Sequence, residues 1–501
     1  MRRFNERKRF MSLLGIDLGT TGCKAGVFGL DGACLAQAYR EYDMLHPQPG
    51  WSELDSSKVW KKTKEVIAEV AAQSKNDPIT ALSISAFGEA FVPVSKVRKI
   101  LDNSILCVDD RGREHTDRLL EEFGQEKFYA INPNLIGPNF SLPKLLWLRE
   151  HRAEVFEQAD YFLLWSDAIA FLLGCEPVTN NSHANRTLLF DLDKNDWSDE
   201  LLAWSGIPRE KLGRIVCGGD VIGTVSDSMA AELGLPKNVQ VVAGGHDQCC
   251  NALGCGTIEA GKAVYGMGSF DCITPVYKKP SDPLSMLREG LNIEHHVLPD
   301  LYVSFLFNQA GLLVKWFRDT FASPSVAYET LDAEMPLGPT GLLVLPHFDP
   351  PPWPQYIPDT SGMIMGLKTG TKRGEILKAV RESVALYFVE GMTALKNIGC
   401  DTSEFIASGG GATSDPGLQI RADIFGIPIV RPRITEAGLL GTAMLAGLGT
   451  GVFQTLEESV ELFVQRDRVF EPDAARHAIY QEKHALYRQL FNTNRELLEQ
   501  L

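Results

Sequence analysis

The chain has 501 residues, of which 44% are hydrophobic and 23% charged, a composition typical of globular proteins and too apolar for a disordered one. It carries 64 acidic and 49 basic residues, a net charge of -15, which argues against a general nucleic-acid or anionic-membrane binder because both need a positive field. The length predicts two or more domains, and no apolar stretch approaches the roughly 20 residues of a membrane span.

The first ten residues are predicted to be a disordered basic tail. Residues 1–11 are rich in Arg and Lys but lack the apolar run and cleavage site of a secretory signal, and Met11 is an alternative start. The 10 Cys residues are scattered, without a C-x-x-C pair or a Cys/His cluster of metal-ligand spacing. We therefore expect reduced core cysteines and a cytoplasmic protein.

The first half of the chain begins with an expected β-hairpin. Residues 13–28 form an apolar run, a Gly/Thr-rich turn and a second apolar run. Apolar positions at helical spacing predict a helix over 58–73, and 80–94 indicate a strand, a glycine turn and a strand. The pattern from about 115 to 235 is mostly helical, and 239–245 indicate a buried strand that ends in glycines.

A second block, residues 266–276, is similar to residues 17–27. Both are strand–glycine turn–strand segments, and they are identical at three pairs of positions, Gly19/Gly268, Cys23/Cys272 and Val27/Val276. This likeness predicts two similarly built domains that meet at about 248–262. The alternative, two unrelated glycine turns, stays open at this point.

The second half continues the alternation of strands and helices, which argues for an α/β protein. One segment, 435–448, is rich in small residues and predicts a helix that packs closely. The other expected elements are strands at 341–346 and 404–408, and amphipathic or short helices at 374–397, 416–425 and 475–501.

Three glycine-rich turns, at 17–22, 244–246 and 409–412, follow apolar strands. Glycines let backbone N–H groups point into one concavity, which suits phosphate oxygens, although none of the turns fits the P-loop or the G-x-G-x-x-G pattern. Asp17 and Asp247 lie at the first two turns, and phosphoryl transfer needs a cation and a group that orients the attacking hydroxyl. The structural alternatives are an Asp17 that caps its own turn and an Asp247 that caps a helix.

Several motifs, in family order from residue 13 to about 450, resemble the FGGY family of carbohydrate kinases. They are L-G-I-D-L-G-T-T at 14–21, G-W-S-E-L-D at 50–55, S-x-x-x-E at 85–89, D-D-R at 109–111, R-T-L-L-F-D-L at 186–192, G-G-H-D-Q at 244–248, G-M-G-S at 266–269, A-S-G-G-G-A at 407–412 and Q-I-R-A-D-I-F-G-I-P-I at 419–429.

The resemblance implies an α/β fold with two similar ribonuclease-H-like or actin-like ATPase domains, of the actin/hexokinase/Hsp70 type, around a central interdomain cleft. The expected N-terminal domain, residues 11–250, holds the sugar pocket and the first phosphate turn. The expected C-terminal domain, residues 251–501, holds the second phosphate turn and the adenosine site.

The resemblance also assigns roles to residues of this chain. Asp247 is the expected general base. Mg²⁺ is expected at Asp17 and Asp247, with ATP as co-substrate. The ATP phosphates are expected at Thr20, Thr21, Lys24, Gly268 and Ser269, the adenosine at Gly410, Gly411 and Ser414, and the substrate at Glu89, Asp110, Arg111, His246 and Gln248.

The implied activity is transfer of the ATP γ-phosphate to a hydroxyl of a small ketose, of the xylulose or fuculose type, or of a polyol. The alternatives are a polyol kinase of the glycerol or erythritol type, a non-catalytic nucleotide switch and an actin-like polymer. The sequence departs from the family pattern at Ala86-Phe87-Gly88, Val108 and His246, which shape the sugar pocket, so it leaves the sugar open. Expected partners are the sugar and ATP, with no nucleic acid or membrane; a homodimer stays open.

Overall fold

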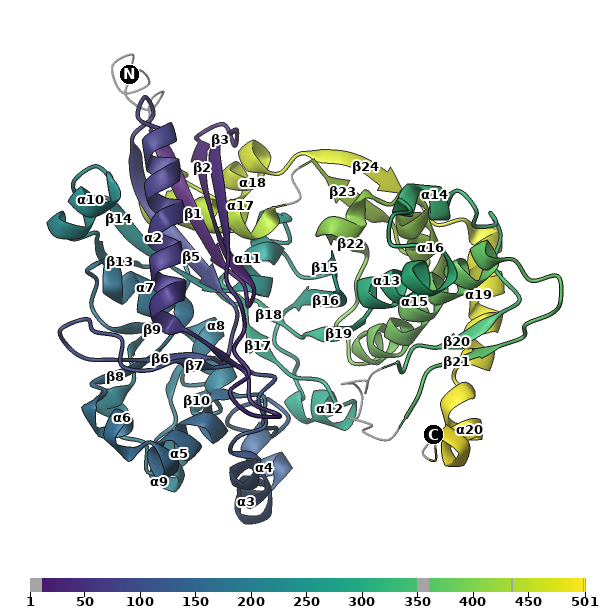
Figure 1. Cartoon of the computed structure of the whole chain (residues 1–501), viewed down its shortest axis with the longest axis horizontal. Coiled ribbons are helices and arrows are strands. Elements are labelled where there is room, and N and C mark those ends of the chain that lie inside the picture. The colour runs from purple at the N-terminus through teal and green to yellow at the C-terminus, as the bar shows by residue number, and fades with distance from the viewer. Residues whose placement is uncertain (1–10, 349–359, 434–435, 499, 501) are drawn as a thin grey trace. The chain divides into compact units, whose positions relative to one another are not determined.

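Figure 1 shows the computed structural model, which describes residues 11–348, 360–433, 436–498 and 500. The chain divides into two compact units. The first contains Met1–Ile258, Asn292–Val303 and Glu436–Gln465, and the second contains Glu259–Leu291, Ser304–Thr435 and Arg466–Leu501. The expected tail, residues 1–10, lies outside the described residues. The division into family domains at residue 250 stays a prediction, because compact units and family domains need not coincide.

The first unit is built on a six-stranded sheet. Strand β1 pairs antiparallel with β2 and parallel with β5, so the hairpin expected at 13–28 is confirmed. On the far side of β5 lies β14, which is parallel to it and ends in the expected glycines. The strand order is β13 (Val221–Thr224), β14 (Gln240–His246), β5 (Ile79–Ala86), β1 (Ser12–Leu18), β2 (Gly22–Gly29) and β3 (Cys34–Glu41).

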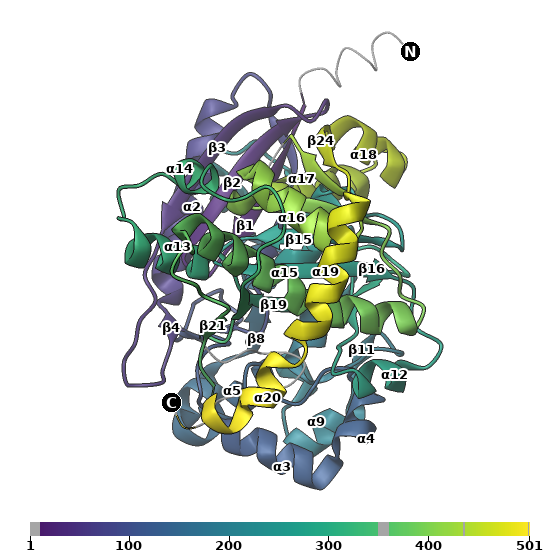
Figure 2. The ribbon, with the colours of Figure 1, turned by 90° about the vertical axis from the view of Figure 1, so that its right-hand side faces the viewer.

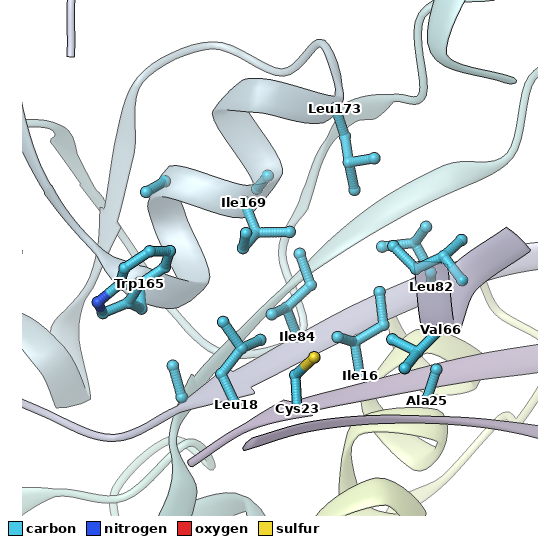
Figure 3. Packing of buried hydrophobic residues seen from close by; sticks show 14 of the residues in the cluster. Ile16, Leu18, Cys23, Ala25, Val66, Leu82, Ile84, Trp165, Ile169 and Leu173 are labelled. Carbon is cyan, nitrogen blue, oxygen red and sulfur yellow. The ribbon is translucent and has the colours of Figure 1, made fainter. Parts of the chain in front are cut away.

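Helices cover this sheet, and buried apolar side chains join them to it. Helix α2 (Ser56–Gln73), which matches the expected helix at 58–73, begins where Asp55 Oδ1 accepts a 2.9 Å hydrogen bond from Lys58 N. It packs on β2 and β3, and α7 (Trp165–Leu173) packs on β5. Figure 3 shows side chains of α7, among them Ile169, close to Ile84 of β5 in one cluster. Because strands buried on both faces read as continuous apolar runs, β1 is apolar almost throughout.

Helix α17 (Ala437–Gly449) packs closely on β1 and on α11 (Asp247–Gly254), as its small residues predict. A Cβ added to Gly15 of β1 would lie 2.3 Å from Leu439 O. Added to Gly441, it would lie 1.9 Å from Cys250 O, and added to Gly254, 1.9 Å from Ala437 O. Only glycine permits these approaches, so the three glycines fix α17 against the elements that carry Asp17 and Asp247.

The stretch from 115 to 235 is helical, as expected, but short strands interrupt it. The two strands expected at 80–94 do not pair with each other, because β6 (Phe91–Val94) pairs with β8 (Tyr161–Leu164) and not with β5. The remaining helices are α3 (Arg113–Phe123), α4 (Gln125–Tyr129), α5 (Ser141–His151), α6 (Ala153–Gln158), α8 (Asn181–Ala184), η1 (Asn185–Thr187), α9 (Asp199–Ser205), η2 (Arg209–Lys211), α10 (Asp227–Leu233) and α18 (Leu456–Phe463). The remaining strands are β4 (Glu53–Leu54), β7 (Ser104–Ile105), β9 (Val178–Asn180), β10 (Phe190–Asp191), β11 (Asp196–Trp197), β12 (Arg214–Val216), β17 (Glu294–His295) and β18 (Tyr302–Val303).

The second unit repeats the plan of the first, which confirms the expectation of two similar domains. Its hairpin β15–β16 holds the Gly268-Ser269 turn, β19 pairs antiparallel with β16, and β22 and β23 follow in parallel on the other side of β15. An antiparallel edge strand, β24, closes this side as β13 does in the first unit. The strands are β15 (Lys262–Met267), β16 (Phe270–Tyr277), β19 (Leu306–Gln309), β22 (Glu404–Ser408), β23 (Ile429–Pro432) and β24 (Arg466–Phe470).

The helices of the second unit match the predictions at 374–397 and 416–425. The prediction of one continuous helix over 475–501 is wrong. The described residues of the segment 475–501 form two helices because the chain turns after Tyr487, and Leu490 and Leu498 of the second helix are buried. Figure 2 shows the two in yellow. The helices are α12 (Pro283–Arg288), α13 (Gly311–Phe321), α14 (Tyr328–Asp332), α15 (Arg373–Asn397), η3 (Gly410–Thr413), α16 (Asp415–Phe425), α19 (Ala474–Tyr487) and α20 (Leu490–Leu498), with a small hairpin of β20 (Leu343–Leu345) and β21 (Met363–Met365).

Within the described part of the chain, no helix has both the length and the apolar character that crossing a membrane requires.

Candidate active site

Asp17 projects from β1 and is held by the neighbouring strand. Ser85 Oγ of β5 donates a 2.5 Å hydrogen bond to Asp17 Oδ1. A Cβ on Gly438 of α17 would lie 3.3 Å from Asp17 Oδ2, so a larger residue there would crowd the carboxylate. Desolvation raises the pKa of Asp17. The carboxylate is thus fixed by β5 and does not cap its own turn, the alternative that the sequence left open.

The turn after Asp17 is tied down by Tyr42, which sequence reasoning missed. Gly19 N donates to Gly22 O at 2.9 Å, and Tyr42 Oη donates to Gly19 O at 2.6 Å. Thr20 is half-buried and Thr21 is exposed on this fixed turn. The two hydroxyl groups are therefore presented by a rigid backbone.

Lys24 is engaged by an acidic neighbour. Its Nζ lies 2.6 Å from Glu436 Oε2, and both side chains are partly exposed. Lys24 stands opposite Asp17 in the register of β1 and β2. A role for Lys24 in phosphate binding stays a prediction, and it would require the lysine to exchange or share its partner.

Asp247 is the first residue of α11, and the N-cap of this helix is His246, whose Nδ1 accepts from Gln248 N at 3.2 Å. Asp247 Oδ1 also accepts from Gln248 N, at 2.6 Å, so both side chains serve the first turn of α11 although His246 holds the N-cap position. The Asp247 side chain is 29% exposed. Desolvation and, next, the negative charge of Asp17 raise the pKa of Asp247 to about 8. The two acids, far apart in sequence, thus share one electrostatic environment.

Glu89 and His246 lie in the same region. Glu89 has a φ of 65°, a left-handed conformation uncommon for a glutamate, and Ser141 Oγ donates to its carbonyl oxygen. A Cβ on Gly88 would lie 2.8 Å from His246 Cδ2, so the ring packs against this glycine. Burial keeps the pKa of His246 well below its ordinary value. The charge of Glu89 also raises the pKa of Asp247.

Asp110 and Arg111 form a different environment. The Arg111 side chain is 2% exposed and lies 2.7 Å from both Glu53 and Asp109. Its guanidinium group also stacks between Trp51 and Trp147, at 4.0 and 4.8 Å from the ring centroids. Asp110 is 68% exposed. Arg111 is thus held by protein partners, and its contact with a substrate stays a prediction.

In the second unit, the predicted nucleotide residues come together around one cavity of about 430 Å³. Gly268 O and Ser269 O accept hydrogen bonds from the N-terminus of α13, from Gly311 N at 3.0 Å and Leu312 N at 3.1 Å. Ser414 Oγ accepts a 3.1 Å hydrogen bond from Gly417 N and so caps α16. The predicted residues that line the cavity are Gly268, Ser269, Gly410, Gly411 and Ser414.

Two buried ion pairs, which sequence reasoning missed, line this cavity. Asp271 pairs with Arg421 at 2.6 Å, and Asp332 pairs with Arg381 at 2.6 Å. Ser414 Oγ donates to Asp332 Oδ2 at 2.6 Å, which links the cap of α16 to the second ion pair. The partners of each pair are distant in sequence, so no local pattern pointed to them.

The described residues contain no group of three or more His, Cys, Asp or Glu side chains that could hold a metal ion. Mg²⁺ does not need such a cage, because it keeps several waters and binds one or two carboxylates together with substrate phosphates. Asp17 and Asp247 are carboxylates whose mutual repulsion a cation would relieve. The donor set therefore fits Mg²⁺.

Two family models and several known proteins are similar to most of this chain. The model of the N-terminal domain of the FGGY family of carbohydrate kinases matches residues 12–254, and that of the C-terminal domain matches residues 271–450. The xylulose kinase of Bacillus subtilis is 28% identical over 490 residues, 97% of each chain. The glycerol kinase of Bordetella parapertussis is 30% identical over 483 residues, 92% of each chain. The crystal structure of xylulose kinase from Rhodospirillum rubrum has a TM-score of 0.88 at 26% identity and covers 97% of this chain and 99% of its own.

The fold is thus the two-domain, actin-like ATPase fold of sugar kinases. The chain belongs to the FGGY family of carbohydrate kinases. It is accordingly a phosphotransferase that uses ATP as co-substrate and an alcohol group as acceptor, which confirms the family, fold class and enzyme class expected from the sequence motifs.

Proposed function

We propose that this kinase phosphorylates a small ketose of the pentulose or hexulose type. The observation that carries the proposal is Asp247, a carboxylate with a pKa of about 8 at the start of α11, in the company of Glu89 and Asp17. Xylulose kinases among its relatives favour a ketose. A polyol is the second candidate, favoured by the glycerol kinase relatives and by the acid at position 89.

In this proposal Asp247 is the general base. A sugar hydroxyl is a weak nucleophile at neutral pH, and a carboxylate within about 2.6–3.2 Å accepts its proton. The hydroxyl oxygen then bonds to the γ-phosphorus, the bond to the β–γ bridging oxygen breaks, and ADP leaves. Positioning and charge neutralisation supply most of the rate. Glu89, Asp110, Arg111, His246 and Gln248 are the proposed substrate contacts.

The nucleotide is proposed to bind at the two glycine turns. Thr20, Thr21, Lys24, Gly268 and Ser269 are the proposed phosphate contacts. The cavity lined by Gly410, Gly411 and Ser414 is the proposed adenosine site. Mg²⁺ would be held by Asp17 and Asp247, and when bound it neutralises phosphate charge.

The test is a screen of ADP release with Mg-ATP over pentuloses, hexuloses and polyols, with Asp247→Asn as the blank. We expect one or a few ketoses to give the highest kcat/KM. Turnover of polyols alone would favour the second candidate. ADP binding without turnover of any sugar would instead favour the nucleotide-switch alternative.

A further inference from the structure

The motif at 186–192 received no role from the sequence, and the structure gives one to its first residue. Arg186, in η1, joins two carboxylates: its Nε donates to Glu89 Oε1 at 2.6 Å and its Nη1 donates to Glu294 Oε1 at 2.7 Å. Nη2 also donates to Glu89 Oε1. We call Glu89, Arg186 and Glu294 the carboxylate bridge.

The carboxylate bridge is buried and held on all sides. The exposed fractions of the side chains are 12% for Arg186, 9% for Glu89 and 1% for Glu294. Glu294 also accepts from the side-chain amides of Asn185 and Asn292, each at 2.7 Å. The ring of Phe140 lies 4.8 Å from the guanidinium. Arg186 therefore has little freedom to turn toward a ligand.

The bridge has a charge imbalance. One guanidinium faces two carboxylates, which leaves an excess negative charge in a region where burial limits screening. The hydrogen bonds from Arg186 Nε and Nη2 to the Glu89 carboxylate both fall on Oε1, and Oε2 is an acceptor that suits a substrate hydroxyl. Such a site favours a hydroxyl donor and disfavours an anion.

We infer that Arg186 is a specificity-determining positioning residue, which holds Glu89 toward a substrate hydroxyl. Because the Arg186 charge is already paired with protein carboxylates, it does not attract a substrate anion. The enzyme therefore accepts neutral ketoses and polyols and rejects sugar acids. The inference rests on the proposed function, since it places the substrate beside Glu89 and Asp247. It deepens that proposal by defining the charge of the substrate.

The first test uses the unmodified enzyme. Each neutral sugar of the ADP-release screen is paired with the aldonate of the same carbon number, such as D-gluconate for a hexulose. We expect kcat/KM to be at least about 100-fold lower for the aldonate, as expected when a site leaves a charged group unpaired. Comparable turnover of an aldonate would overturn the inference alone. Absence of turnover for every compound would instead overturn the proposed function.

The second test removes one charge from the bridge. Glu294→Gln keeps the shape of the side chain. In the wild type, Asn185 Oδ1 is a buried acceptor without a hydrogen-bond donor. A flip of the Asn185 amide would let this oxygen accept from the new glutamine amide. We expect the Ki of an aldonate, measured as a competitive inhibitor, to fall roughly tenfold, since a nearby buried negative charge has been removed. The Tm should confirm that the variant folds. An unchanged Ki would contradict the inference.

Two further variants separate positioning from a merely structural role. Arg186→Gln would leave buried carboxylates unpaired and can fail to fold, so Arg186→Lys is the informative change. Lysine keeps the charge but loses the planar fork, and we expect KM for the neutral sugar to rise more than kcat falls. A fall in Tm with KM unchanged would refute the positioning role. Asp196→Asn, which removes an exposed partner of Arg209, is the control and should leave both parameters unchanged.

Discussion

The negative charge of Asp17 raises the pKa of Asp247, a carboxyl group whose burial has already raised it. The pair exists because α17 packs through glycines on β1, which carries Asp17, and on α11, which starts at Asp247. Each acid disfavours ionisation of the other, and a bound cation would relieve this repulsion.

Asp247→Asn should abolish phosphoryl transfer without loss of nucleotide binding. The amide cannot accept the hydroxyl proton, and we expect kcat to fall by roughly 10²–10⁴-fold, the usual contribution of a general base. Coupled ADP-release kinetics measure kcat, and calorimetry measures ADP affinity. Asp196→Asn is the matched control, because it removes an exposed carboxylate from the same unit. A kcat near that of the wild type would defeat the assignment of the base.

The activity should increase with pH through the pKa of Asp247. A general base acts in its ionised form. Because the pKa of Asp247 is about 8, kcat/KM should rise with pH and reach a plateau above that pH. Asp17→Asn should lower this pKa, because it removes a negative charge that raises the pKa of Asp247. Carbon-13 NMR titration of the ligand-free protein, labelled at aspartate, measures the shift independently of activity. A pKa of Asp247 that stays the same or rises in the variant would show that the two carboxylates do not interact.

Asp247→Asn should also stabilise the ligand-free protein at high pH. The folded-state pKa of about 8 lies above the ordinary value of 3.8, so the folded state of the wild type loses stability as pH rises from about 4 through 8. The asparagine variant does not carry this cost. The difference in Tm between variant and wild type should therefore be larger at pH 9 than at pH 5. A difference independent of pH would mean that Asp247 is not destabilised by its charge.

Gly410→Val should weaken ADP binding and leave the fold intact. A Cβ at Gly410 meets no atom within 4 Å, and the residue lines the cavity of the second unit, so a larger side chain would fill space proposed for adenosine. We expect a loss of about 10–200-fold in affinity, the usual effect of a misplaced methylene-sized group. Gly370→Val is the control, because a Cβ there also meets nothing within 4 Å and the residue lies outside that cavity. Equal ADP affinities in both variants would remove Gly410 from the proposed site.

The sequence alone determined the parts of this protein that depend on neighbouring residues. The hairpin at 13–28, the long helix at 374–397 and the glycine turns follow from local periodicity and turn chemistry. Contiguous motifs also indicated the family and the acids at 17 and 247, because those residues belong to short conspicuous runs. The close packing of 435–448 was foreseen from its small residues, although not the strand and helix that it contacts.

Only the tertiary structure decided the contacts between distant segments. Arg186 and its partners Glu89 and Glu294 come from three separate parts of the chain, and the members of the ion pairs Asp271–Arg421 and Asp332–Arg381 in the cavity of the second unit are likewise distant in sequence. Spacing along the chain carries no information about such pairs, because the fold, not the local pattern, brings their elements together. The break after Tyr487 is likewise absent from the sequence pattern, because the apolar positions keep helical spacing across it.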